Sequence, residues 1–275
     1  MNEPRLTPDD VRIWDAWRRQ CEVHARTDLH RRRVDRSIGI VREMMERVPG
    51  AYIAWSGGKD STAMLHLAAV AAGAPGRIMA QKDDGDFPGE VEYLHGVMAQ
   101  FGLPMERLDI IRPEPGDGVQ AWLAAFGRQI DAHDDVHGRG SDLSERVFYG
   151  PIRAYSEAAG RPGVYLGLRT EESRGRRANR ASRGTIYTRA GGEVVCTPLA
   201  DWHGADVYGY LFTRGIEPLH VYHCVRLMDR PDLVRKSWWI PGAHTTSGGM
   251  VWLRSYYPSL WRRLVALVPT AGWNS

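Results

Sequence analysis

A glycine-containing segment in the first quarter of the chain carries the residue types that bind phosphate. Residues 56–62 read Ser-Gly-Gly-Lys-Asp-Ser-Thr, between an apolar run at residues 51–55 and a stretch of helical spacing at residues 63–68. Adjacent glycines allow a turn whose successive N–H groups point at an anion, just where a helix presents its positive end. The segment therefore predicts a phosphate-binding turn between a buried strand and a helix. An ordinary glycine-rich turn is the structural alternative.

The side chains of this segment have distinct uses around a phosphate. Lys59 supplies a compact positive charge, and Asp60 supplies a carboxylate able to hold Mg²⁺ beside the phosphates. The hydroxyl groups of the two serines and the threonine add hydrogen-bond donors. The spacing is not the Walker pattern G-x-x-x-x-G-K-[ST]. The expected nucleotide-binding residues of the segment are Ser56, Gly57, Gly58, Lys59, Asp60, Ser61 and Thr62.

Lysine is rare in this sequence. The basic residues other than Lys59, Lys82 and Lys236 are all arginines. Genome composition is the simplest explanation of that bias. In a chain that nearly always uses arginine, however, a lysine inside the glycine turn indicates a position that needs a slim point charge rather than a planar fork. The same argument applies, with less force, to Lys82 and Lys236.

The elements that must position these groups can be predicted from the hydrophobic pattern. Apolar runs predict strands, and helical spacing with capping residues predicts helices. The strands are expected at residues 51–55, 76–81, 105–111 and 164–168, with a small hairpin at 185–188 and 193–196. Besides the helix that follows the turn, helices are expected at residues 7–20, 28–48, 88–101, 117–127, 145–159, 201–213 and 248–267. This order predicts an α/β fold with a doubly wound, mainly parallel sheet.

The chain is expected to have three regions. A helical extension at residues 1–49 leads into an α/β nucleotide-binding domain at residues 50–200, and a helical segment at residues 201–275 completes the site. The 43% of hydrophobic residues and the net charge of +3 are typical of a soluble globular protein and give no argument for nucleic acid as a partner. We expect a cytoplasmic protein, because no apolar run has the length of a membrane helix and the first residues lack a signal-peptide pattern.

Two further polar segments follow expected strands. Residues 82–88 read Lys-Asp-Asp-Gly-Asp-Phe-Pro, and residues 169–174 read Arg-Thr-Glu-Glu-Ser-Arg. Ligands bind outside the carboxyl ends of the strands in an open parallel sheet, so these segments and the glycine turn are expected to meet around a nucleotide and its metal ion. For residues 83–86 a solvated turn is the alternative.

Seven arginines gather after the fourth expected strand. They are Arg169, Arg174, Arg176, Arg177, Arg180, Arg183 and Arg189. The functional interpretation is a clamp for phosphate, sulfate or another anion, because guanidinium groups make bidentate contacts with such groups. Arg169 and Arg174 are nearest to the strand end and are the first candidates. A basic solvated loop is the alternative.

The order of four segments resembles the phosphoadenosine phosphosulfate (PAPS) reductase family, which includes the small catalytic subunit of bacterial ATP sulfurylase. These segments are residues 56–68, 83–90, 167–174 and 197–208, and the resemblance covers roughly residues 30–225. It implies the five-stranded sheet of the PP-loop ATP pyrophosphatases, a HUP-type fold, with helical additions at both ends. It also implies an enzyme that binds an adenine nucleotide, with Mg²⁺ as the cofactor of ATP, and acts at the α-phosphate or at a group attached to it.

The resemblance also implies roles for individual residues. Lys59, Asp60 and Arg169 are the implied catalytic residues, and Asp60 is the implied metal ligand. Contacts with the nucleotide beyond the glycine turn are implied for Asp83, Asp84, Gly85, Phe87 and Gly167. Contacts with the substrate anion are implied for Arg169, Glu172 and Arg174.

The cysteines depart from the pattern of the reductases. Those enzymes attack the sulfonucleotide with a cysteine in a C-terminal E-C-G-L-H segment, whereas no cysteine follows Cys224 here. Cys21 and Cys196 are far from it in sequence, so there is no C-x-x-C spacing for a metal or iron–sulfur site, and we expect reduced thiols. We therefore expect nucleotidyl transfer rather than reduction. Cys224 is either a substitute nucleophile or metal ligand or, more simply, a buried cysteine.

Three functions are compatible with the sequence. The first is transfer of AMP from Mg-ATP to an acceptor anion with release of pyrophosphate, and sulfate is the acceptor that the family suggests. The second is sulfonucleotide reduction, and the third is nucleotide binding without turnover. The acceptor, a protein partner and a homo-oligomer are left open, and RNA binding is suggested only by the arginines. Residues 244–249 offer either a second anion-binding turn or a helix N-cap.

Overall fold

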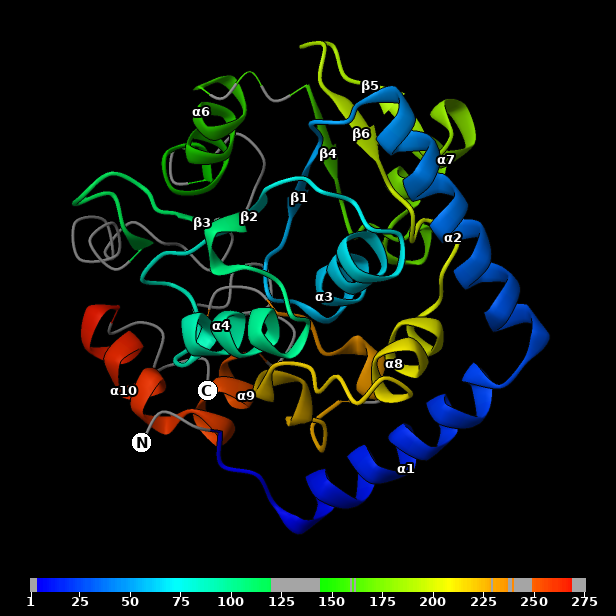
Figure 1. Cartoon of the computed structure of the whole chain (residues 1–275). Coiled ribbons are helices and arrows are strands. Elements are labelled where there is room, and N and C mark those ends of the chain that lie inside the picture. Colours follow the sequence, from blue (N-terminus) through cyan, green and yellow to red (C-terminus); the bar gives the residue numbers. More distant parts are fainter. Residues whose placement is uncertain are drawn as a thin grey trace.

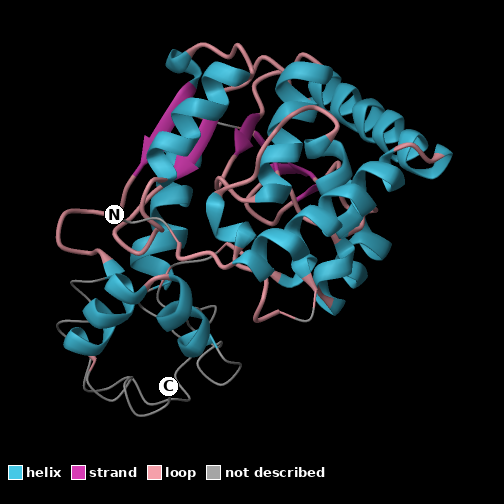
Figure 2. Cartoon of the chain, turned by 90° about the horizontal axis from the view of Figure 1, so that it is seen from below, coloured by secondary structure: helices cyan, strands magenta, loops and turns pink. Residues whose placement is uncertain are grey.

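A six-stranded sheet lies at the centre of the molecule, with helices around it (Figure 1). The computed structural model describes residues 4–119, 144–158, 160, 162–228, 230–236, 239 and 249–268. The strands are β1 (Tyr52–Ala54), β2 (Ile78–Gln81), β3 (Leu108–Ile111), β4 (Gly163–Tyr165), β5 (Ile186–Thr188) and β6 (Val194–Cys196). The helices are α1 (Pro8–Ala25), α2 (Asp28–Arg47), α3 (Lys59–Leu65), α4 (Glu90–Gln100), α6 (Gly150–Ala158), α7 (Arg174–Arg183), α8 (Gly204–Phe212), α9 (Gly249–Tyr256) and α10 (Pro258–Leu267). Figure 2 shows that helices make up most of the periphery.

The sheet is mainly parallel, as predicted. Its order is β3-β2-β1-β4-β6-β5, and every neighbouring pair is parallel except β5 and β6. The predicted hairpin of β5 and β6 is part of the main sheet, because β6 also pairs with β4, with Gly163 opposite Val194. The sheet therefore has six strands rather than the expected five. The α/β class and the mainly parallel arrangement are confirmed.

Both faces of the sheet are covered, which confirms the doubly wound arrangement. Successive side chains of a strand point to opposite faces. Ile53 of β1 belongs to the main apolar core, which it shares with Val41 of α2 and Met64 of α3. Its neighbour Tyr52 belongs to a smaller cluster on the other face, against which Ile152 of α6 packs.

The two ends of the described chain share one further core. Trp14 of α1 lies in an apolar cluster with Leu253 of α9 and other residues of the C-terminal helices. The buried carboxylate of Asp10 accepts a hydrogen bond from the backbone N–H of Arg226 at 2.8 Å and another from the hydroxyl of Tyr256 at 2.5 Å. Helix α1 is thereby fixed to the C-terminal segment. The division of the chain into three regions stays a prediction.

Two helical segments differ from the prediction. The arginine-rich stretch forms helix α7, where no helix was predicted, and Ser173 caps it by accepting a hydrogen bond from the N–H of Arg176 at 3.1 Å. The single helix expected at residues 248–267 is divided into α9 and α10, because Pro258 has no N–H and cannot continue a helix.

Some predictions fall on residues outside the description. They are the helix at 117–127 beyond residue 119 and the anion-binding turn or N-cap at 244–249 before Gly249. Among the helices that the structure describes, none is long and apolar enough to cross a membrane.

Candidate functional site

The glycine turn lies at the carboxyl end of β1, as predicted, and leads into α3. Gly57 has a φ of +82°, in the left-handed region that side chains rarely adopt, and Gly58 is the N-cap of α3. The backbone N–H groups of Asp60 and Ser61 lie in the first turn of this helix, where helix geometry provides no intrahelical acceptor. The positive end of α3 is therefore at the carboxyl edge of the sheet, where an anion binds favourably.

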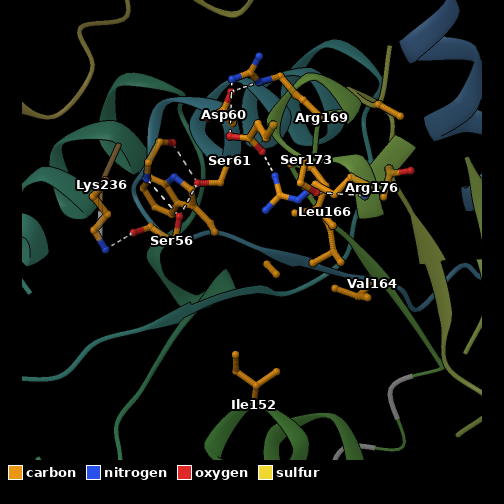
Figure 3. A pocket seen from close by; sticks show the side chains of 18 of the residues that line it. Ser56, Asp60, Ser61, Ile152, Val164, Leu166, Arg169, Ser173, Arg176 and Lys236 are labelled. Atoms are coloured by element: carbon orange, nitrogen blue, oxygen red, sulfur yellow. Dashed lines mark hydrogen bonds and ion pairs between the residues drawn. The ribbon is translucent and has the colours of Figure 1, made fainter. Parts of the chain in front are cut away.

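Asp60 joins the two cations that were predicted to be catalytic. Its Oδ2 accepts a hydrogen bond from Lys59 Nζ at 3.0 Å. Its Oδ1 accepts one from Arg169 Nε at 2.6 Å, and Figure 3 shows Asp60 beside Arg169. Burial by itself would raise the pKa of Asp60, but the charges of Lys59 and Arg169 outweigh it and hold that pKa below its ordinary value. This contact joins the segment after β4 to the start of α3.

Lys59 is a buried cation whose charge is incompletely balanced. Its side chain is 2% exposed. Burial lowers the pKa of Lys59, and the nearby charge of Arg169 lowers it further, although Asp60 acts in the opposite direction. An anion beside Lys59 would stabilise its charged form.

A chain of ion pairs connects this group to α7. Arg169 contacts Glu171, and its Nη2 lies 3.6 Å from Oε1 of Glu172. Glu172 in turn pairs with Arg176, the third residue of α7. Helix α7 is thereby held beside the end of β4, and Glu172, which was predicted to contact the substrate anion, is one member of this chain.

The other two lysines of the sequence also lie at the glycine turn. The Nζ atoms of Lys82 and Lys236 donate hydrogen bonds to the carbonyl oxygen of Ser56 at 3.1 and 3.0 Å. Each also contacts Oε2 of Glu90, at 2.6 and 2.8 Å, and Oδ1 of Asp86, at 3.5 and 3.0 Å. Two lysines and two carboxylates therefore fix the carbonyl group at which the turn begins. The rarity of lysine marked both positions, and Asp86 lies in the segment 82–88 that was expected at the site, whereas Glu90 was given no role there.

Tyr222 is a site residue that the sequence analysis missed. Its hydroxyl accepts a hydrogen bond from the backbone N–H of Lys59 at 3.1 Å, and Lys59 Nζ lies 5.1 Å from the centre of its ring. A Cβ atom at Gly58 would lie 3.1 Å from the same hydroxyl, so Tyr222 also limits the size of residue 58. One N–H of the turn is thus bound to the protein itself. No local pattern marks Tyr222, because 163 positions separate it from Lys59.

Gly167 is required by the close approach of β4 to α3. A Cβ atom at this position would lie 2.9 Å from the carbonyl oxygen of Asp60 and 2.9 Å from the backbone nitrogen of Ser61. Such distances are too short for unbonded atoms, and the neighbouring atoms belong to the backbone of the first helical turn. The residue type at 167 therefore decides how closely the segment after β4 can approach the start of α3.

Many of these groups line a cleft of about 1420 Å³. Its cations are Lys59, Arg169, Arg176, Arg180, Arg183, Arg189, Arg235 and Lys236. Its carboxylates are Asp60, Asp83, Asp86 and Glu172. Polar uncharged and apolar side chains line the remainder, and among the apolar ones Ile152 of α6 faces Val164 and Leu166 across the cleft (Figure 3). The cleft therefore offers an excess of cations for an anionic ligand beside an apolar area for a base or another flat group.

The cleft brings together part of the predicted set of residues. The predicted residues that line it are Ser56, Gly58, Lys59, Asp60, Ser61, Asp83, Gly167, Arg169 and Glu172. The predicted residues that are not among those lining it are Gly57, Thr62, Asp84, Gly85, Phe87 and Arg174. Asp84 and Gly85 contact the C-terminal segment instead, since their carbonyl oxygens accept hydrogen bonds from Nε1 and the backbone N–H of Trp239 at 3.1 and 2.7 Å.

Three other predicted residues have structural environments of their own. The hydroxyl of Thr62 accepts a hydrogen bond from Trp55 Nε1 at 3.0 Å, so it fixes the strand to the helix. Phe87 is buried in the apolar cluster of the terminal helices, with its ring centre 4.9 Å from that of Tyr257. Arg174 is exposed at the first position of α7. Contacts of these residues with a ligand stay predictions.

Asp60 has the chemistry expected of a magnesium ligand. Mg²⁺ is commonly bound through one or two carboxylates together with substrate phosphates and water. The carboxylate of Asp60 lines the cleft beside the helix terminus, and each of its oxygens has one cationic contact and a remaining acceptor position. The residues present therefore fit a magnesium ion that arrives with a nucleotide.

The cysteines are not part of the described cleft lining. Cys21, Cys196 and Cys224 are buried free thiols, and none of them is among the residues that line the cleft in the described part of the chain. Burial raises the pKa of each thiol, to about 12 for Cys21 and further for the other two. A thiol is nucleophilic as a thiolate, so these cysteines are poorly suited to attack a ligand. The simpler interpretation of Cys224 as a buried cysteine agrees with this.

Two curated proteins that are similar to this chain are both named sulfate adenylyltransferase subunit 2. The one from Hahella chejuensis (strain KCTC 2396) is 25% identical over 201 residues, which are 68% of this chain and 64% of the relative. The one from Marinomonas sp. (strain MWYL1) is 26% identical over 200 residues, with the same two coverages. The chain thus spans less than two thirds of the length of these relatives.

The chain is also similar to a solved structure and to a family profile. The phosphoadenylyl-sulfate (PAPS) reductase from Candida auris, in its phosphate complex, matches with a TM-score of 0.50 and 17% identity, over 66% of this chain and 81% of that one. This likeness concerns the fold alone. Residues 50–231 match the profile described as the phosphoadenosine phosphosulfate reductase domain, which is more than half of the chain. The protein therefore belongs to the phosphoadenosine phosphosulfate reductase domain family.

Proposed function

We propose that this protein transfers the adenylyl group of ATP to an acceptor anion and releases pyrophosphate. The observation that carries the proposal is the pair of buried cations, Lys59 and Arg169, on the two oxygens of Asp60 at the start of α3. In such a transfer an acceptor oxygen forms a bond to the α-phosphorus, and the bond from that phosphorus to the bridging oxygen breaks. The pyrophosphate carries away the electron pair. Cations and helix N–H groups stabilise that charge, so a general base on the protein is not required.

The residues of the turn would each have a defined part. The N–H groups of Asp60 and Ser61 would bind the phosphates, and Lys59 would neutralise charge on the departing pyrophosphate. Asp60 would hold Mg²⁺, which supplies further charge neutralisation at the phosphates when it is bound. Lys236 and Lys82 would keep the carbonyl group of Ser56 in place, so that the turn does not reorganise when the ligand binds.

The cysteines favour transfer over reduction. A thiol-based reduction requires a thiolate near the sulfonucleotide. The three cysteines of the sequence are buried, have raised pKa values and are not among the residues that line the cleft. The cleft offers cations and carboxylates instead.

Sulfate is the first acceptor to test. The similar proteins from Hahella and Marinomonas are named as subunits of sulfate adenylyltransferase, which supports both a sulfate acceptor and a second kind of subunit as partner. On this proposal, the acceptor anion would bind to the arginines of α7 that line the cleft, Arg176, Arg180 and Arg183. Arg176 would then take the role that the sequence analysis gave to Arg174.

The test is the position at which ATP is cleaved. The purified chain is incubated with Mg-ATP and a panel of acceptors that includes sulfate, phosphate and small carboxylates, with and without a candidate partner subunit. AMP transfer releases pyrophosphate, so β,γ-imido-ATP should release imidodiphosphate, whereas α,β-methylene-ATP should be inert. Release of ADP and phosphate instead would contradict the proposal.

Matched variants connect this activity to the turn. Lys59→Ala should lower kcat/KM for pyrophosphate release by about 100-fold or more, the magnitude typical of one lost transition-state contact. Arg177→Ala is the control, because Arg177 is exposed on α7 and is not among the residues that line the cleft. Binding of ATP without turnover under all conditions would favour the third function, a nucleotide-binding module.

A further inference from the structure

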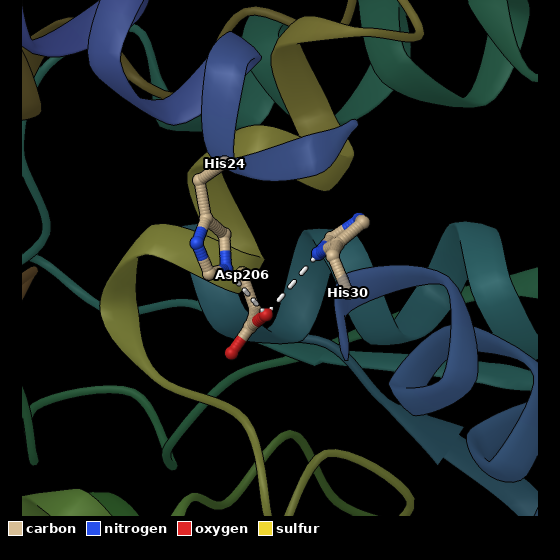
Figure 4. Close-up of side chains that lie close together, drawn as sticks. All are labelled: His24, His30 and Asp206. Carbon is tan, nitrogen blue, oxygen red and sulfur yellow. Dashed lines mark hydrogen bonds and ion pairs between the residues drawn. The ribbon is translucent and has the colours of Figure 1, made fainter. Parts of the chain in front are cut away.

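Three side chains from three helices meet where α1, α2 and α8 come together (Figure 4). His24 is in the last turn of α1, His30 is in the first turn of α2, and Asp206 is in the first turn of α8. His24 Nε2 lies 2.8 Å and His30 Nδ1 lies 3.2 Å from one carboxylate atom, Oδ1 of Asp206. The three atoms lie within 4.8 Å of one another. None of these residues is among those that line the cleft, so this is a separate place in the molecule.

The other oxygen of Asp206 orients the carboxylate. Oδ2 accepts hydrogen bonds from Arg33 Nη1 at 2.5 Å and from the backbone N–H of His203 at 2.8 Å. Carboxylates that bind metal ions are commonly held in this way, with one oxygen on the metal and the other hydrogen-bonded to the surrounding protein. Oδ1 contacts the two imidazole groups.

The three side chains are buried to different extents. The side chain of Asp206 is 0% exposed and that of His30 is 4% exposed, whereas that of His24 is 27% exposed. An ion could reach the group from the side of His24, and a water molecule on that side could complete its coordination. A site with three protein ligands and one open position is a common arrangement for zinc.

We propose that His24, His30 and Asp206 form a binding site for one divalent transition-metal ion of the zinc class. Imidazole nitrogen and carboxylate oxygen are ligands that such ions prefer. Ligand atoms around a tetrahedral zinc ion are about 3.3 Å apart, given zinc–ligand distances of about 2.0–2.1 Å, so the observed 2.8 and 3.2 Å require only a small opening. When the ion is bound, each imidazole would be neutral and would carry its one proton on the ring nitrogen away from the ion, and the ion would replace the contacts of Nε2 and Nδ1 with Oδ1.

The ion would fix the joint between α1 and α2 to the start of α8. Helix α8 packs against α1 and against α3, which begins at the glycine turn. Arg33 is the cation that faces this group, and its contact with Oδ2 places it on the side of the carboxylate away from the imidazoles. The role inferred is therefore to hold α1, α2 and α8 together, and it does not depend on the reaction proposed for the cleft.

Metal titration of the whole chain tests this inference. Protein freed of metal with a chelator is titrated with Co²⁺ and then with Zn²⁺. We expect one equivalent of Co²⁺ to give visible d–d bands of a site with four or five ligands, without a thiolate charge-transfer band, and Zn²⁺ to displace it. X-ray absorption of the zinc form should show two imidazole ligands. An absence of stoichiometric binding, or a site without imidazole, would overturn the proposal.

The variant His24→Gln combined with His30→Asn separates a metal site from a hydrogen-bonded cluster. The amide nitrogens of glutamine and asparagine can take the places of Nε2 and Nδ1 and still donate to Asp206, so the contacts that support the fold are kept. We expect the unchanged protein to show a zinc-dependent rise in Tm, and we expect this variant to lose that rise and at least 100-fold in Co²⁺ affinity. His24→Gln alone, at the most exposed ligand, should already lose at least tenfold.

His95 provides the matched control. It is an exposed histidine on α4, and His95→Ala should leave the titration unchanged. Equal affinity in the unchanged protein and in the His24→Gln, His30→Asn protein would show that the cluster is only hydrogen-bonded and would refute the site.

Discussion

Nε of Arg169 donates a hydrogen bond to Oδ1 of Asp60 at 2.6 Å, which joins the segment after β4 to the first turn of α3 across 109 positions of sequence. Lys59 occupies the other oxygen of the same carboxylate. One side chain therefore holds two buried cations at the end of the helix that is proposed to bind phosphate.

Asp60→Asn should destabilise the protein by about 3 kcal/mol, because breaking a buried ion pair leaves a charge without its partner. This expected loss of stability is at the lower end of the range for breaking a buried ion pair, because Arg169 keeps its contact with Glu171. Urea unfolding followed by circular dichroism measures it. Asp35→Asn on the exposed face of α2 is the control and should change stability little. Equal stability of the two variants would show that the carboxylate of Asp60 is not a structural anchor.

Gly167→Ala should destabilise the protein by about 1–3 kcal/mol, the range for overpacking of a tight contact. The added Cβ would meet the carbonyl oxygen of Asp60 and the nitrogen of Ser61 at 2.9 Å, so β4 and α3 would have to move apart. Gly191→Ala is the control, because nothing lies within 4 Å of a Cβ at that position. Thermal unfolding of both variants tests whether the segment after β4 approaches α3 this closely. Equal Tm values for Gly167→Ala and Gly191→Ala would contradict the close approach.

Lys236→Met should loosen the glycine turn. Its ammonium group contacts Ser56, Asp86 and Glu90, and each hydrogen bond to a charged group contributes about 1.5–3 kcal/mol. Amide hydrogen exchange at residues 56–61 should become at least tenfold faster, and the affinity for ATP should fall by a similar factor. Arg263→Ala, at an exposed position of α10, should leave both unchanged. Unaltered exchange in Lys236→Met would mean that Lys82 alone holds the turn.

ATP affinity should decline with rising pH before the ordinary lysine pKa of 10.5 is reached. Burial lowers the pKa of Lys59, so its charge is lost at a lower pH than in an unfolded chain. In that interval the unfolded chain binds more protons than the folded one, so the unliganded protein gains stability as pH rises while its attraction for phosphate falls.

Calorimetric titration with ATP across alkaline pH measures the decline. Lys59→Arg keeps a positive charge throughout this range, so its affinity should show a much shallower decline. Identical profiles for the two proteins would assign the pH dependence to another group.

The local part of the site could be predicted from the sequence because it is contiguous. Strand β1, the turn and α3 follow one another within residues 52–65, and their apolar pattern and glycines are read over short distances. The rarity of lysine marked Lys59, Lys82 and Lys236 as candidates, and in the structure all three lie at the glycine turn. The sheet and its parallel order followed from the alternation of strands and helices.

Helix α7 shows why other elements could not be predicted. Its residues are arginine-rich and give no apolar stripe, which is the main signal for a helix. The helix is supported instead by the Ser173 cap and by the pairs of Arg176 with Glu172 and of Arg180 with Asp201. Asp201, the partner of Arg180, lies 21 positions further along the sequence, beyond β5 and β6.

The sequence by itself determined the turn, its charges and the mainly parallel arrangement of the sheet, since each depends on residues within one or two neighbouring elements. Only the tertiary structure decided that Arg169 and Asp60 pair, that Tyr222 binds the N–H of Lys59, and that His24, His30 and Asp206 meet. Those contacts arise when elements far apart in sequence pack together, and a side chain's type does not state which distant partner the packing will bring within hydrogen-bonding distance.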